Sequence, residues 1–182
     1  MRLGEYLRKM RGTTRGSPPR VSNSEVVWSW VGSFIGILAV GWCNQLWFKG
    51  TDLTLLIGSF GASAVLVYGA VRSPLAQPRN LVGGHVVSAF TGVVAWKLFH
   101  TDPWLASAFA VATAIAMMHI TRTLHPPGGA TALIAVIGSD QIHAAGFTYV
   151  LIPATLGPVI LLVVALVINN LAPRRRYPEI WW

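Results

Sequence analysis

The sequence predicts an all-α polytopic membrane protein with about six membrane segments, two of them short or broken. Three observations carry this prediction. The 182 residues are 53% hydrophobic and only 11% charged, whereas about a quarter of the residues in a soluble domain are charged. Between Val26 and Leu171 the few charged residues fall in or near the breaks between apolar runs. These runs are close to the roughly 20 residues that a membrane-spanning helix needs.

The individual segments follow from the apolar runs. They cover residues 26–48, 53–71, 81–99, 104–121, 124–138 and 147–171. The second contains Gly58-Ser-Phe-Gly-Ala-Ser63, and the fifth opens with His125-Pro-Pro-Gly-Gly-Ala-Thr131. Proline lacks an amide donor and is favoured in the first turn of a helix. We therefore expect both segments to be interrupted, with the fifth helix beginning near Pro126.

Three regions differ in composition. Residues 1–24 are basic and rich in Gly, Ser and Pro, and we expect them to be a mobile cytoplasmic N-terminus. Residues 25–172 are the expected transmembrane domain, and residues 173–182 are a basic and aromatic cytoplasmic C-terminus. The net charge of +8 would suit nucleic acid in a soluble protein. Because the charges flank apolar runs here, we expect membrane lipid and no nucleic acid as partner.

The distribution of charge bears on topology. If all six segments cross the membrane, one face receives 12 of the 14 Lys and Arg residues. The positive-inside rule then places both termini in the cytoplasm. If the second and fifth segments are re-entrant instead, three arginines move to the other face and the bias weakens. We favour six crossings.

A faint internal repeat supports this arrangement. Gly61-Ala-Ser-Ala-Val65 resembles Gly129-Ala-Thr-Ala-Leu133 at an offset of 68 residues, and the same offset carries residues 81–99 onto 149–167. Each copy would hold three crossings, so the second copy would be inverted in the membrane. Transporters recurrently combine inverted repeats with broken helices, and bind substrate between them near the midplane.

The two broken helices supply most of the candidate binding residues, and His85 follows Gly83-Gly84 early in the third segment. The amino-terminal ends of the broken helices would face each other near the midplane, where backbone amides and positive dipole ends suit an anion. Hydroxyl groups would add donors, and small residues would let a ligand approach the backbone. The candidates are Gly61, Ala62, Ser63, His85, His125, Gly128, Gly129, Ala130 and Thr131. The alternative is that the small residues only allow close helix packing.

The histidines and the basic residues allow more than one role. His125 stands at a helix break and could donate to an anion or accept a proton near neutral pH. Polar packing between helices would explain His125 and His85 equally well. Arg79, Asn80 and Lys97 are candidate entrance residues, with contacts to lipid headgroups as the alternative. We expect no metal site, because the histidines lack close ligand spacing and acidic neighbours, and we expect no cofactor.

A family resemblance joins these motifs. His125-Pro-Pro-Gly-Gly-Ala-Thr-Ala-Leu133, with Ser73-Pro-Leu-Ala-Gln-Pro-Arg-Asn80 and Gly83-Gly-His85, resembles the HPP family of integral membrane proteins over residues from about 26 to 171. The family is often described with four spans rather than six. The resemblance implies nitrite transport in nitrogen assimilation. It also implies a bacterial, in particular cyanobacterial, inner membrane, with a plastid envelope as the alternative.

The sequence therefore predicts a transporter or channel for a small monovalent anion, with nitrite as the substrate, assembled as a homo-oligomer. A regulatory or scaffold membrane protein without transport is one alternative. An intramembrane enzyme is another, since Ser63 and His125 could serve as nucleophile and base. No Gly-x-Ser-x-Gly element is present, and carboxylates are absent from the spans, so we expect no enzymatic activity.

Overall fold

The computed structural model describes residues 3–10, 16–17, 19–50 and 54–182. Four charged residues of the charge distribution above lie outside these ranges: Arg2, Arg11, Arg15 and Asp52. The elements are α1 (Leu3–Lys9), α2 (Asn23–Trp47), α3 (Ser59–Ala64), η1 (Val65–Gly69), η2 (Pro74–Ala76), α4 (Pro78–Phe99), α5 (Pro103–Ile120), α6 (Pro126–Ile137), α7 (Asp140–Ala145), α8 (Thr148–Leu151) and α9 (Leu156–Leu171). No strand occurs among the described residues.

Four helical segments of the described chain are long and apolar enough to cross a membrane. They are α2, α4, α5 and the segment Thr148–Leu171, which contains α8 and α9. Two shorter apolar helices, Ser59–Gly69 and Pro126–Ile137, complete a set of six. α6 has 12 residues, which at 1.5 Å per residue gives about 18 Å, short of the roughly 30 Å hydrocarbon core. The predicted all-helical membrane fold, with two short segments among about six, is confirmed.

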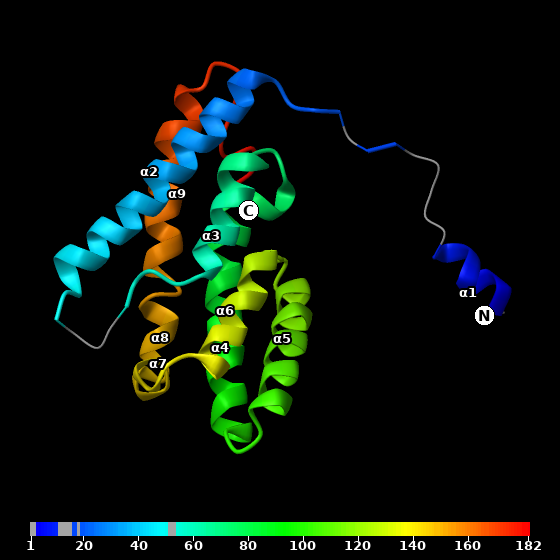
Figure 1. Ribbon diagram of the computed structural model, residues 1–182, viewed down its shortest axis with the longest axis vertical. Helices are drawn as coiled ribbons and strands as arrows, with labels where there is room; N and C mark the ends of the chain where they lie inside the picture. Colours follow the sequence, from blue (N-terminus) through cyan, green and yellow to red (C-terminus); the bar gives the residue numbers. More distant parts are fainter. Residues whose placement is uncertain (1–2, 11–15, 18, 51–53) are drawn as a thin grey trace.

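The helices pack in two groups, which Figure 1 shows side by side. α5 and α6 pack on α4, whereas α2 packs on α9 and on η1. α3 joins the groups because it contacts α6 as well as α2 and α9. α4 is the central helix: half of its apolar window is buried, against 17% for α2. The side chains that α2 leaves exposed are large and apolar, such as Phe34 and Trp42, as expected for a surface in contact with lipid.

The two short helices run in opposite directions from a shared level. In Figure 1, α3 continues upward from Ser59 into η1, and α6 continues downward from Pro126. This arrangement agrees with the predicted inverted repeat. Ser63 and Thr131, which the 68-residue offset makes equivalent, are both buried on the faces that approach α4.

Close packing beside η1 depends on two glycines of α2. The buried Tyr68 ring lies against them, and a Cβ atom added at Gly32 would lie 2.7 Å from Cδ1 of that ring. The Tyr68 hydroxyl donates to the Leu161 carbonyl at 2.9 Å. η1 is a π-helical turn, and Asn169 Nδ2 of α9 donates to the Val67 carbonyl at 3.0 Å. π-Turns of this kind often mark functional sites.

Residues 172–182 form a C-terminal strap across one end of the molecule. Arg175 forms an ion pair with Glu25 at 2.7 Å and donates to Ser29 Oγ at 2.8 Å. The Tyr177 hydroxyl donates to the Ala76 carbonyl at 2.8 Å, and the Glu179 amide donates to Gln77 at 2.9 Å. The strap therefore ties the start of α2 and the η2 turn to the end of α9.

The ends of the chain and the last segment differ from the expectation. Residues 3–9 form the exposed helix α1, which Figure 1 shows away from the bundle. The last segment, residues 147–171, for which no break was predicted, is broken between Leu151 and Leu156. Pro153 stands in this break, where its missing amide removes a helical hydrogen bond.

Candidate functional site

Five polar side chains form a buried cluster where the two short helices begin. They are Ser59, Ser63, His85, His125 and Thr131, and none is more than 1% exposed. α3 contributes the two serines, α4 contributes His85, and the start of α6 contributes His125 and Thr131. Polar groups buried in a membrane protein are costly unless they are bonded, and they mark functional sites by default. We refer to these five residues as the polar cluster.

Ser63 is the central residue of the polar cluster. Its Oγ lies 2.7 Å from His85 Nε2 and 2.9 Å from His125 Nε2. The carbonyl of Ser59, one turn earlier, lies 3.2 Å from the same oxygen. One hydroxyl thus joins two imidazole rings, whose centroids are 5.2 Å apart.

His85 lies between the two repeat-equivalent hydroxyls. Its Nε2 faces Ser63, and its Nδ1 lies 2.6 Å from Thr131 Oγ1. The Thr131 hydroxyl in turn lies 2.8 Å from Ser59 Oγ, so the contacts return to α3. The edge of the Phe60 ring packs against the imidazole at 5.4 Å between centroids. His85 therefore connects α3 to α6 through the central helix.

The position of His125 follows from the proline after it. A residue before proline is driven into the extended region, and His125 has φ −140° and ψ 103°. This conformation directs the ring back toward α3, where Nδ1 donates to the Leu75 carbonyl of η2 at 2.8 Å. The missing side chain of Gly84 provides space for His125, because a Cβ atom at Gly84 would lie 2.5 Å from the His125 Cβ. The ring is fixed on both of its nitrogens.

Tyr149 of α8 supports the polar cluster from the side. Its hydroxyl donates to the backbone carbonyl of Thr131 at 3.0 Å, and the ring is fully buried. Because this hydrogen bond is to the backbone, Tyr149 orients the first turns of α6 rather than the Thr131 hydroxyl. The broken segment of α8 and α9 thereby contacts the start of the other short helix.

The structure brings together four of the nine candidate binding residues: Ser63, His85, His125 and Thr131. Gly61 and Ala62 lie on the exposed face of α3, away from the polar cluster. Gly128 is buried against Gly84 and Ser88 of α4, where it allows close helix packing. Gly129 and Ala130 are half-buried, and the nearest atom to a Cβ at Gly129 belongs to Val111 of α5.

Backbone amides at the helix starts are already engaged. Those of Phe60 and Gly61 donate to the carbonyls of Ile57 and Gly58, and that of Gly128 donates to the His125 carbonyl. The two prolines of α6 have no amide hydrogen. The expected donation from backbone amides to an anion is therefore absent at these positions in this conformation, and side chains are the donors of the site.

The candidate entrance residues lie at opposite ends of α4. Arg79 donates to the Thr121 carbonyl at 2.7 Å, and Asn80 donates to the Leu124 carbonyl at 2.8 Å. Both therefore fix the loop that carries His125. Lys97 lies at the far end over the Phe147 ring, 5.7 Å from its centroid, and lines a cavity of about 230 Å³.

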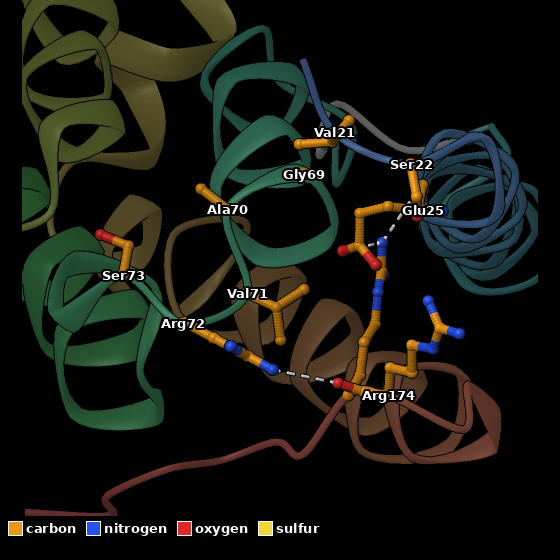
Figure 2. Close-up of a pocket in the computed structure, with 10 residues that line it drawn as sticks. Val21, Ser22, Glu25, Gly69, Ala70, Val71, Arg72, Ser73 and Arg174 are labelled. Carbon is orange, nitrogen blue, oxygen red and sulfur yellow. Dashed lines mark hydrogen bonds and ion pairs between the residues drawn. The ribbon is translucent and has the colours of Figure 1, made fainter. Parts of the chain in front are cut away.

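A second, basic cavity opens at the end that carries the strap. It has a volume of about 430 Å³ and lies between the start of α2, the end of η1 and the strap. Figure 2 shows Arg72 extended toward Arg174, whose carbonyl accepts a hydrogen bond from it at 3.2 Å. The arginines here are paired, since Arg72 lies 3.9 Å from Glu179 and Arg175 lies 2.7 Å from Glu25, which also lines the cavity.

Sequence reasoning missed three groups at the site. Ser59 precedes Ser63 by four residues, so helical periodicity alone could have placed both on one face. Tyr149 was within an expected span but carried no pattern of its own. The Leu75 carbonyl belongs to a turn, and the residue types of this turn do not predict the direction in which the carbonyl points.

The fold and the polar cluster define an α-helical membrane protein with a buried hydroxyl and imidazole site between two short, oppositely directed helices. The chain matches the family described as "HPP, transmembrane region" over residues 18–178. It therefore belongs to the HPP family of transmembrane proteins, as the resemblance implied. The family match covers the whole polar cluster.

Two curated relatives come from Dictyostelium discoideum, and both are named only as transmembrane proteins. One is 45% identical over 98% of this chain and 58% of its own length. The other is 42% identical over 100% of this chain and 65% of its own length. The chain thus spans about three fifths of these relatives, which lend no support to a bacterial or cyanobacterial membrane. No solved structure matches the chain.

Proposed function

We propose that this chain moves a small monovalent anion across the membrane, with nitrite as the first substrate to test, and that the polar cluster is its binding site. One observation carries the proposal: five fully buried polar side chains meet where two short helices begin, inside a bundle whose outer face is apolar. Transporters bind substrate at such junctions of broken helices.

The chemistry of the cluster favours an anion. Two imidazoles and three hydroxyls can donate, whereas none of the five side chains is a carboxylate that would attract a cation. Nitrite is small, and each of its two oxygens can accept a hydrogen bond. It could bridge donors on α3 and α6, which two successive hydrogen bonds link through His85. The nitrite assignment itself rests on the family resemblance.

Transport requires the cluster to open, because its side chains have no exposed surface in this conformation. α3 and α6 contact each other and both approach α4 through hydrogen bonds of His85. We propose that movement of these two short helices relative to α4 admits the anion, first from one end and then from the other. Such gating of one repeat against the other is the usual mode of alternating access.

The decisive experiment is flux of nitrite into vesicles that contain the purified protein. Ser63→Ala, His85→Gln and Thr131→Val each remove donors or acceptors of the cluster, and uptake should fall at least about tenfold, because one hydrogen bond to a charged group contributes about 1.5–3 kcal/mol. His119→Gln on the exposed surface of α5 and Ser107→Ala, whose half-buried hydroxyl donates to the Pro103 carbonyl of the same helix, are matched controls. If all three cluster variants fold and take up nitrite at the parent rate, the binding site lies elsewhere.

A protein that folds normally but gives no anion flux would support the regulatory or scaffold alternative. The Ser63 and His125 pair also has the spacing of a nucleophile and its base, which makes a hydrolase the second candidate. Covalent labelling of Ser63 by a fluorophosphonate probe distinguishes it, and we expect none, because the proposed role of Ser63 is hydrogen bonding.

We further propose that both termini are cytoplasmic and that the chain assembles as a homo-oligomer. Gly61 and Ala62 support assembly, because small residues on an exposed helix face let another helix approach closely. Chemical crosslinking in the membrane should give a dimer or larger species, and a wholly monomeric product would contradict this. The expected bacterial or plastid membrane gains no support from the relatives.

A further inference from the structure

The polar cluster forms one unbroken string of hydrogen-bonding groups. In order they are the Leu75 carbonyl, His125, Ser63, His85, Thr131 and Ser59, and each successive pair of atoms is 2.6–2.9 Å apart. Every side chain in the string can both donate and accept, because neutral imidazole and hydroxyl groups do both. Such a string can shift its protons without moving its heavy atoms.

The Leu75 carbonyl sets the direction at one end. A carbonyl only accepts, so His125 Nδ1 must carry a hydrogen. If the ring is neutral, its Nε2 accepts from Ser63, whose oxygen accepts from His85 Nε2. His85 Nδ1 then accepts from Thr131, whose hydroxyl hydrogen has turned to it from the Ser59 oxygen. All five side chains are neutral in this first arrangement.

A second arrangement satisfies the same contacts with one additional proton. The three bonds that involve the histidines reverse: His85 Nδ1 donates to Thr131, Ser63 to His85 Nε2, and His125 Nε2 to Ser63. The Thr131 hydroxyl then donates to Ser59. His125 keeps its Nδ1 hydrogen on Leu75 and becomes an imidazolium. The added proton enters at the Ser59 end and is held at His125, because the carbonyl beyond it cannot pass a proton on.

The surroundings leave that imidazolium without a permanent counter-charge. On the described elements that pack around the histidine pair, α3, α4, α5, α6 and η2, there is no carboxylate. The titratable or charged neighbours are Tyr149, bonded to the Thr131 carbonyl, and Arg79, bonded to the Thr121 carbonyl. A charge buried in a membrane protein is costly unless it is paired. A negatively charged solute would supply the partner.

We propose that the polar cluster takes up one proton with each anion, so that the species carried is a neutral pair of proton and anion. This inference rests on the proposed transport function and adds its stoichiometry and its driving force. The proton binds at His125 when the anion binds, and both leave together when the site opens on the other side. His125 then returns to the neutral arrangement, and no bond other than those to hydrogen is made or broken.

The test measures proton and nitrite uptake in the same vesicles, which contain a trapped pH-sensitive dye and whose voltage is clamped with potassium and valinomycin. We expect each nitrite ion that enters to bring one proton into the lumen, at a rate above that in protein-free vesicles. A change in membrane voltage should leave the rate of nitrite uptake unchanged. A pH gradient without nitrite should move no protons. Nitrite uptake that carries current and no proton would overturn the inference and leave the proposed function standing.

A second arm isolates His125. His125→Gln keeps an amide donor for Leu75 but cannot hold a proton, so proton uptake should fall to the protein-free rate, whereas His119→Gln should keep it. Because the glutamine variant could fail to fold, infrared difference spectra of the parent protein with histidine isotope labels provide an independent reading. Added nitrite should produce an imidazolium signal. Proton-coupled nitrite uptake by folded His125→Gln, or the absence of an imidazolium signal in the parent protein, would refute the coupling of protons to anions. The absence of any nitrite uptake would instead refute the proposed transport function.

Discussion

His125 illustrates how single residues determine the site. Pro126 fixes its backbone, the Leu75 carbonyl fixes its Nδ1, and Gly84 provides the space for its side chain. None of these three residues contributes a reactive side chain. The geometry of the polar cluster therefore depends on neighbours that a search for reactive side chains would pass over.

At this scale we predict the effect of Gly84→Ala. The added methyl group would lie 2.5 Å from the His125 Cβ and 2.9 Å from the Thr123 carbonyl, so α4 and the start of α6 must separate. Overpacking of this kind costs about 1–3 kcal/mol. Thermal unfolding in detergent should show the loss. Gly41→Ala, where nothing lies within 4 Å of the new atom, is the control and should be neutral or stabilising, and an equally stable Gly84→Ala would contradict the packing.

The site residues were predictable only in part, for physical reasons. The helix breaks and the repeat indicated Ser63 and Thr131. The break also indicated His125, whereas His85 was indicated by its place after Gly83-Gly84 in the third segment. Gly61 and Ala62 were included because they are neighbours in sequence, but successive helical residues point about 100° apart, so a run of neighbours cannot face one site. The choice of face requires knowledge of where α4 lies, which local sequence does not contain.

At the scale of elements, the C-terminal strap links distant parts of the chain. It binds η2 through Ala76 and Gln77, and η2 holds His125 through the carbonyl of Leu75. Sequence composition identified this segment as basic and aromatic but gave no reason to expect it to pack. Its packing depends on Tyr177, which is 2% exposed.

We predict that the strap weakens at high pH. Burial raises the pKa of the Tyr177 hydroxyl above its ordinary value, which is about 10 in an unfolded chain. A group whose pKa is raised in the folded state stabilises fully below the unfolded value, and that contribution declines as the pH rises above it. Tyr177→Phe should lower the unfolding midpoint at neutral pH, since the lost hydrogen bond to Ala76 contributes about 1 kcal/mol.

The comparison of the two proteins across pH tests this. Above about pH 10 the midpoints of the parent and of Tyr177→Phe should converge, because the parent loses the contribution that the variant never had. Tyr149, another buried tyrosine, is present in both proteins, and its contribution cancels in the difference. A difference that stayed constant or grew through this range would contradict the assignment to Tyr177.

At the scale of the whole molecule, both short segments connect the two ends of the bundle. α6 begins beside η2, through the bond of His125 to Leu75. The chain after α6 then reaches the far end of α4, where the rings of His143 and Trp96 stack at 3.8 Å. The usual description of the family with four spans is compatible with the count of six segments from the sequence, because four segments are long and two are short.

We therefore predict that Arg72 and Arg122 share the cytoplasmic face. With Cys43 replaced by alanine, single cysteines at either position should react with an impermeant reagent only from the cytoplasmic side. A cysteine at Asp140 should react only from the opposite side. All three positions are exposed, so access is not limited by packing. Labelling of the cysteine at position 122 from outside would mean that the segment Ser59–Gly69 returns to the side from which it started.

The packing of α2 on α9, two helices far apart in the sequence, has a consequence for how the protein is made. Among the long helices of the described residues, α2 is synthesised first, but its main partner, α9, is synthesised last. The amino-terminal half must therefore wait in the bilayer, or at the insertion machinery, until residues 156–171 have been synthesised. Only then can Arg175 reach Glu25, its ion-pair partner 150 residues earlier in the chain. Assembly of this protein is completed after synthesis of its spans rather than span by span.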